Sequence, residues 1–287
     1  VVAEGSLVSQ VWTNNGGPLR NVRVTKPAGV LRFAGSALTL TEALLVSLGA
    51  FKADSFQTVT ARTLRTLGSG GILGITAGIP PAAPTFSVDS AVFSGGPSPI
   101  NAGALTVRRA FAQSGAANSY QAGVQWLTSF AGALPKTVAF ATPGAGQSYF
   151  TGLQLSGNRS VQLLTDMRVE NATGISAQSP NDTLLLNGRR LTVVGNLNVQ
   201  GAIPFDGVGG TVDVQGALGM LTGGTFAPDT FVQSGVARTI TRGVGATFRN
   251  VVVATTSGLG SFASTTDSLL GSLIVRGAAA NLTLQND

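Results

Sequence analysis

The sequence predicts an all-β protein organised as a parallel β-solenoid with irregular loop insertions. From Leu191 to Gly201, apolar or small residues alternate with other residues, which indicates a β-strand with one buried face. Similar strand-like phrases recur along the chain and end at small residues, whereas helical periodicity is weak. Recurring strands with the same inward residues favour a coil in which each strand stacks on an earlier one.

The recurrence is clearest in three phrases that share one order of residue types. They are PLRNVRV at 18–24, YFTGLQL at 149–155 and TFRNVVV at 247–253, and each follows a Gly-containing loop. FAQSG at 111–115 and FVQSG at 231–235 precede the second and third of them. Their unequal separation indicates a diverged long repeat rather than a regular tandem array.

A shorter repeat consists of LLLNG at 184–188, LNVQG at 197–201 and VDVQG at 212–216. Asn-Gly and Gln-Gly supply the small or left-handed residues that a corner between strands requires. We expect these phrases to be successive stacked rungs. An antiparallel β-sandwich array produces similar spacings and is the alternative fold.

One segment is ambiguous between helix and strand. Residues 39–51 could form a helix that begins at Thr41 and ends at Gly49. The same residues also alternate, and they follow the phrase at 18–24 as a strand would. We therefore expect a strand.

The segment 78–101 holds five of the twelve prolines, which is incompatible with a continuous central strand ladder. We expect a domain boundary or a protruding loop there. The predicted solenoid regions are then residues 1–77, 102–205 and 206–287.

Composition limits the class of protein. The chain has 287 residues, of which 43% are hydrophobic and only 10% are charged, and 39 are glycine. This is typical neither of a disordered chain nor of a coiled coil. The first residues, VVAEGSLVSQ, lack an initiator Met and a signal sequence, so we expect a processed chain or part of a longer one. The longest apolar run, 43–51, is too short for a membrane-spanning helix.

The net charge of +6 comes mainly from arginine, since only three of the 18 basic residues are lysine. The arginines are scattered or paired, without a basic run and without interleaved aromatic residues that could stack on bases. We therefore expect no nucleic-acid partner. A mildly basic, solvated face is the main interpretation, and a surface that faces acidic polysaccharide is the alternative.

Histidine and cysteine are absent from the sequence, which removes the usual near-neutral general base, disulfides and thiolate metal sites. The adjacent aspartates and the Gly-His-Gly of polygalacturonase-like solenoid enzymes are missing as well. We expect a non-catalytic protein without a cofactor. Two tryptophans and two tyrosines could stack on sugars if exposed, but a role in the core is the main expectation for them: Trp12, Trp126, Tyr120 and Tyr149.

The densest acidic region contains Asp166, Glu170 and Asp182, which are weak candidates for a cation site. Asp166 and Glu170 are four residues apart, so on an alternating strand their oxygens would face the same side and could hold Ca²⁺. The stronger expectation is that all three are solvated carboxylates beside Arg168 and Arg189, and that the protein has no metal site.

Two further carboxylates, Asp206 and Asp213, flank the sequence GVGG but lack the regular Gly/Asp nonapeptide of calcium-binding solenoids. Two carboxylates facing each other across a groove would instead indicate a glycosidase.

The segments 138–158 and 184–202 resemble, in pattern, bacterial secreted and cell-surface β-helix proteins of the filamentous-haemagglutinin-like and autotransporter-adhesin-like kinds. The resemblance implies export, an elongated shape and contact with cells, matrix or like subunits. It carries over no binding residue.

These observations predict a non-catalytic, extracellular structural or adhesive protein that assembles through stacked β-strands into a fibre or surface layer. Neither VVAEGSLVSQVW nor ANLTLQND is polar enough to cap a solenoid end, so we expect stacking on another copy or continuation into further repeats. The alternative function is a polysaccharide-binding or polysaccharide-cleaving β-helix, tailspike-like or lyase-like.

Overall fold

The described part of the chain is a parallel β-solenoid. The computed structural model describes residues 1–5, 9–14, 16–35, 37–53, 57–73, 84–170, 175–177, 182–199, 205–220, 226–236, 239–241, 247–257, 259–263, 268–276 and 281–285. These residues contain no helix, and hence no helix long and apolar enough to cross a membrane. Their strands run parallel in stacked coils, so the predicted fold is confirmed and the antiparallel alternative is wrong.

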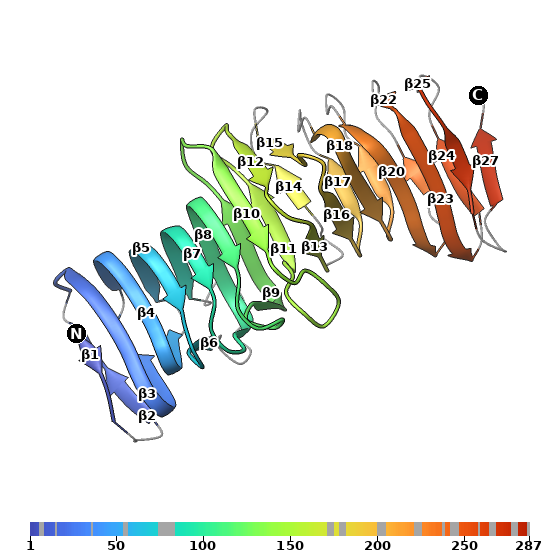
Figure 1. Cartoon of the computed structure of the whole chain (residues 1–287). Coiled ribbons are helices and arrows are strands. Elements are labelled where there is room, and N and C mark those ends of the chain that lie inside the picture. The colour runs from blue at the N-terminus through green and yellow to red at the C-terminus, as the bar shows by residue number, and fades with distance from the viewer. Residues whose placement is uncertain are drawn as a thin grey trace. The chain divides into compact units, whose positions relative to one another are not determined.

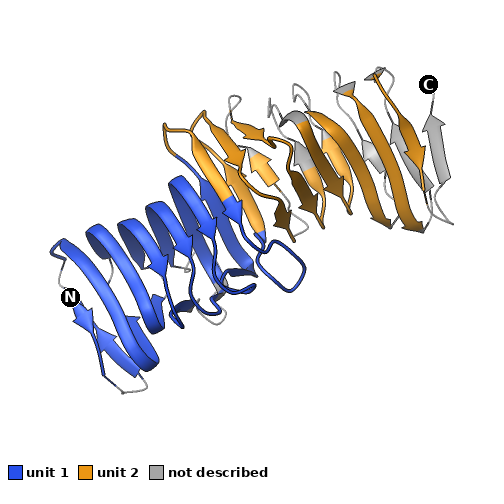
Figure 2. Cartoon of the chain, viewed as in Figure 1, with its two compact units in different colours: residues 1–131, 139–151 blue, residues 132–138, 152–287 orange. Residues whose placement is uncertain are grey.

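The chain forms two compact units, one of residues 1–131 and 139–151 and the other of residues 132–138 and 152–287 (Figure 2). Successive coils follow one another within each unit (Figure 1). The strands of unit 1 are β1 (Val2–Ala3), β2 (Ser9–Trp12), β3 (Leu19–Phe33), β4 (Ala37–Ala53), β5 (Thr58–Thr66), β6 (Gly71–Leu73), β7 (Thr85–Phe93), β8 (Pro99–Gln113) and β9 (Gln121–Phe130).

Strand β10 (Lys136–Phe140) contributes residues to both units. The strands of unit 2 are β11 (Gly152–Leu155), β12 (Ser160–Leu163), β13 (Met167–Val169), β14 (Ile175–Ala177), β15 (Thr183–Leu185), β16 (Arg190–Val193), β17 (Leu197–Val199), β18 (Phe205–Val214), β19 (Leu218–Met220), β20 (Phe226–Val236), β21 (Thr239–Thr241), β22 (Thr247–Phe248), β23 (Asn250–Ser257), β24 (Leu259–Ala263), β25 (Ser268–Leu269), β26 (Leu273–Val275) and β27 (Asn281–Gln285).

Inward-facing side chains at paired positions of successive coils form continuous rows, here called files, through each unit. One file of unit 1 runs through five adjacent coils by direct register pairing, and all of its members are buried: Val22, Leu44, Leu64, Ala91 and Phe111. Each coil satisfies the backbone groups of the next and covers its apolar face. Contacts between adjacent coils therefore join residues that are some 20 to 29 positions apart in the sequence.

The short repeat does not correspond to successive coils. In the structure Leu197 pairs with Leu218, whereas Val212 pairs with Leu191 on one side and with Phe231 on the other. The expectation that LNVQG and VDVQG are adjacent stacked rungs is wrong. Each coil contains more than one strand, so similar phrases lie on different faces of the coil.

Two expectations about single segments have different outcomes. Residues 39–51 lie wholly within strand β4, so the predicted strand is confirmed. The expected boundary or loop at 78–101 is wrong in its described part, because 85–93 is strand β7, which pairs with both β5 and β8. Residues 78–83 lie outside the described residues.

The positions of the prolines explain why strands can form in this segment. Pro84 and Pro97 lie outside strands, and Pro99 is the first residue of β8, where a missing backbone N–H is tolerated. The predicted limits at 77 and 101 fall inside unit 1, and the limit at 205 falls inside unit 2.

Corners between strands use the residues that the sequence indicates. Asn187 and Gly188 have φ angles of 49° and 74°, so both occupy the left-handed region that the predicted corner requires. The asparagines of the recurring phrase RNV join adjacent coils. Asn21 Oδ1 accepts the N–H of Ala43 at 3.0 Å, and Asn250 Oδ1 accepts the N–H of Ser272 at 3.2 Å, each pair being 22 residues apart.

The phrases FAQSG and FVQSG each contain a buried glutamine, Gln113 at the end of β8 and Gln233 within β20. Gln113 Nε2 donates to the carbonyl of Ala116 at 2.9 Å, and its Oε1 accepts the N–H of Thr142 at 3.1 Å. Gln233 Nε2 donates to the carbonyls of Val214 and Gly216, but its Oε1 has no partner among the described residues. Both glutamines therefore have a structural role in holding a corner.

Because more of its polar atoms are engaged, Gln113 is expected to contribute more stability than Gln233. Gln113→Leu should lower the free energy of unfolding by about 2 kcal/mol, since it leaves buried backbone groups unpaired. Gln233→Leu also removes an unsatisfied oxygen and should cost about 1 kcal/mol or less. Urea denaturation of both variants measures the difference, and equal costs would contradict this explanation.

Candidate functional site

The predicted acidic region is dispersed among contacts within the chain. Exposed Asp166 precedes strand β13, and its Oδ1 accepts the backbone N–H of Arg190 at 2.9 Å. Glu170 follows the same strand, and its Oε1 lies 2.6 Å from Nε of Arg168. The two carboxylates therefore have separate partners at opposite ends of a three-residue strand.

Asp182 is completely buried rather than solvated, which corrects the expectation for this residue. Its Oδ1 accepts the backbone N–H of Asn158 at 2.9 Å. Lys136 is also completely buried, and its Nζ donates to the carbonyl of Gly132 at 2.7 Å. Burial lowers the pKa of Lys136, while the charge of Asp182 opposes that shift. The two side chains form an internal electrostatic pair of unit 2.

Within the described ranges, no three acidic side chains come together in an arrangement that could hold a metal ion. Asp213 is nearly buried, and its two oxygens bind Arg190 and the hydroxyl of Ser234. The side chain of Asp206 lies outside the described residues. The candidate carboxylates that the structure describes thus bind arginines, backbone N–H groups or a hydroxyl of the chain itself.

Aromatic residues contribute mainly to the core, as expected for Tyr120 and Trp126. Trp126 Nε1 donates to the hydroxyl of Tyr120 at 2.9 Å, and this hydroxyl lies 2.7 Å from Oγ1 of Thr128. Burial raises the pKa of Tyr120, so its hydroxyl remains protonated. Trp12 is half-buried and packs against Phe33, with ring centroids 5.6 Å apart.

Unlike the inner coils, the last described coil exposes residues of the interior files. Leu273 pairs in register with Val251, and Val275 pairs with Val253. Val251 and Val253 are at most 2% exposed, whereas Leu273 is 41% and Val275 45% exposed. In the described part of the chain β26 pairs with β23 alone. This coil therefore presents both apolar side chains and an unpaired strand edge.

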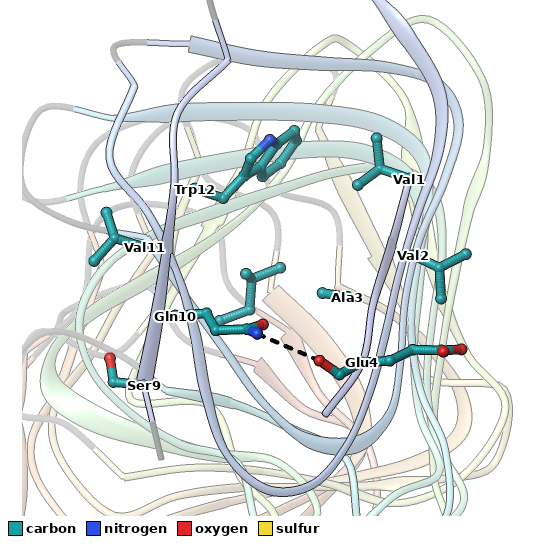
Figure 3. Close-up of a pocket in the computed structure, with 9 residues that line it drawn as sticks. Val1, Val2, Ala3, Glu4, Ser9, Gln10, Val11 and Trp12 are labelled. Atoms are coloured by element: carbon teal, nitrogen blue, oxygen red, sulfur yellow. Dashed lines mark hydrogen bonds between the residues drawn. The ribbon is translucent and has the colours of Figure 1, made fainter. Parts of the chain in front are cut away.

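The first coil contains a corresponding hollow of about 520 Å³, lined by β1, β2 and a leucine of β3. Ala3, Gln10 and Trp12 point into it from two strands (Figure 3). Gln10 Nε2 donates to the carbonyl of Glu4 at 3.3 Å, which joins the two strands across the hollow. Among the described strands β1 and β2 each pair with β3 alone, so their outer edges are also open.

Comparison of the chain with protein-family models, with curated proteins and with solved structures gives no match. The class of the protein therefore follows from its own fold. It is a parallel β-solenoid whose first and last described coils carry unpaired strand edges beside apolar side chains.

The individual residues of these open coils were not predicted from the sequence. Leu273 and Val275 have the same alternation as buried residues of β23, so no local signal marks them as exposed. The buried Lys136 was also missed. The available signal was its alternation with the apolar residues Val138 and Phe140, which places a lysine on the inward face of strand β10.

Proposed function

We propose that the protein is a non-catalytic structural or adhesive protein that assembles by adding one parallel coil to another. The observation that carries this proposal is the exposure of Leu273 and Val275, which continue buried files of unit 2. A further parallel coil would cover these side chains and satisfy the free edge of β26. The setting proposed for such an assembly is the cell exterior, as the low content of charged residues and the pattern resemblance suggest.

A second copy of the chain can supply that coil. Stacking in parallel places the first coil of one copy, with β1 and β2, on the last coil of another. Such contacts join two different surfaces, so they are heterologous and leave a free edge at each end of the product. The expected product is therefore an open filament rather than a closed dimer. Apolar side chains lie at both surfaces, with Ala3 and Trp12 lining the hollow of the first coil and Leu273 exposed at the last.

The test uses the 287-residue chain in sedimentation velocity and electron microscopy over a range of concentrations. The unchanged chain should form longer particles as its concentration rises. Leu273→Arg combined with Val275→Arg should remain monomeric, because two desolvated charges would oppose coil stacking.

Leu164→Arg is the matched control, since Leu164 is 45% exposed, as Val275 is, but follows strand β12 within unit 2. This control should assemble like the unchanged chain. Isolated particles of the unchanged chain at all concentrations would refute the proposal, and so would equal loss of assembly in the control. Thermal unfolding should show that both variants remain folded.

A further inference from the structure

Positive charge is concentrated in one of the two units. Unit 1 contains nine Lys and Arg against four Asp and Glu, which is a net charge of +5. Unit 2 contains nine against eight, which is a net charge of +1. Nearly all of the chain's excess positive charge therefore belongs to unit 1, where it can favour an anionic partner.

Part of this charge is balanced in a file of alternating sign. Asn21, Ala43, Thr63, Ser90 and Ala110 pair in register in successive coils. The residues that immediately precede them are, in the same order, Arg20, Glu42, Arg62, Asp89 and Arg109.

The contacts fit this alternation at Glu42, whereas Asp89 pairs with Arg108, which lies outside the file. Nε of Arg20 lies 2.9 Å from Oε1 of Glu42. Hydrogen bonds from Arg20 and then Asn21 lower the pKa of Glu42, and the charge of Arg62 adds to the effect. Glu42 and Asp89 are thus already engaged by neighbouring arginines.

A neighbouring file carries arginines that are not balanced. Val2, Arg23, Leu45, Arg65 and Val92 pair in register on five successive coils. Arg23 and Arg65 are exposed, and neither guanidinium group has a hydrogen-bond or ion-pair partner among the described residues. Since adjacent strands lie about 4.8 Å apart, these two positions are ~9.6 Å apart along the stack.

We propose that this file, Val2 to Val92 on the outer face of unit 1, binds an acidic polysaccharide laid along the stack of coils. Arg23 and Arg65 would pair with carboxylate or sulfate groups of the polymer, because guanidinium groups bind such anions with two parallel hydrogen bonds. The aliphatic side chains of Leu45 and Val92 would contact the apolar faces of sugar rings. Nucleic acid fits less well, since this file offers no aromatic side chain for base stacking.

The test is a calorimetric titration of the 287-residue chain with oligogalacturonate, with sulfated dextran, with neutral dextran and with a dT oligonucleotide. The unchanged chain should bind one or both acidic glycans in a salt-dependent manner and should not bind neutral dextran. Arg23→Gln combined with Arg65→Gln should raise the Kd for the acidic glycan by about tenfold, as expected for the loss of two partly exposed ion pairs.

Arg189→Gln combined with Arg276→Gln is the matched control. Both arginines are exposed and lie in unit 2, and replacing them removes the same total charge as the first double variant. This control should leave the Kd within about twofold of the original, because long-range screened charge contributes little. Equal weakening by the two double variants would overturn the proposed site. Tighter binding of the oligonucleotide than of either glycan would overturn the polysaccharide assignment. Thermal unfolding should confirm that both variants are folded.

Discussion

Replacing Gly95 with alanine is expected to lower the free energy of unfolding by about 3 kcal/mol, the upper range for overpacking a tight site. A β-carbon at Gly95 would press directly against the carbonyl oxygen of Gly70 in the preceding coil. One at Gly115, in the coil after, would lie 2.8 Å from the carbonyl oxygen of Gly95. Glycines at this corner thus allow three successive coils to approach closely, and an added methyl group would force the backbones apart.

Gly17→Ala is the matched control for this prediction. Nothing lies within 4 Å of a β-carbon at Gly17, and its φ is not in the left-handed region. Its free energy of unfolding should therefore change by less than about 0.5 kcal/mol. Urea denaturation monitored by circular dichroism measures both variants. A Gly95→Ala variant as stable as the control would show that the corner does not require close backbone contact.

Replacing Lys136 with methionine is expected to cost about 3 kcal/mol of stability, because it leaves the buried carboxylate of Asp182 without its cation. The double variant Lys136→Met with Asp182→Asn should recover part of this loss. An asparagine oxygen at position 182 can still accept the N–H of Asn158, and it carries no charge. If the double variant is no more stable than Lys136→Met alone, the two buried side chains are not coupled.

The pair also predicts a dependence of stability on pH. Burial lowers the pKa of Lys136 in the folded chain, so the unfolded chain binds this proton more tightly. Stability should therefore increase as the pH rises from the lowered pKa toward the ordinary value of 10.5. Lys136→Met should lose this contribution, which pH-dependent urea denaturation can measure. An unchanged profile would contradict the assignment.

Prediction from the sequence was most successful where a local pattern has a local cause. The alternation in residues 39–51 predicted strand β4, and Asn187-Gly188 predicted a left-handed corner. It was less successful where the pattern depends on which strands pair. The interval between LNVQG and VDVQG suggested adjacent rungs, although those phrases belong to different faces of the coil.

The candidate sites show the same difference between what local patterns predict and what depends on strand pairing. The acidic residues near Asp166 were visible in the sequence, but their separate partners were not. Arg23 and Arg65 are 42 positions apart in the sequence and have no special local context. Register pairing through Leu45 places them on one file. No single-sequence pattern specifies that pairing, because it depends on the length of every intervening corner.

The sequence by itself therefore determined the strand content and the small residues at the corners, and it indicated a parallel solenoid. The first two properties follow from alternation and glycine conformational freedom, which act over a few positions, whereas the recurring phrases LNVQG and VDVQG do not stack on each other. Only the tertiary structure decided which residues share a file, which polar groups are buried together and which apolar residues remain exposed on the first and last described coils. Those properties depend on contacts between residues some 20 to 29 positions apart, whose register a short stretch of sequence does not encode.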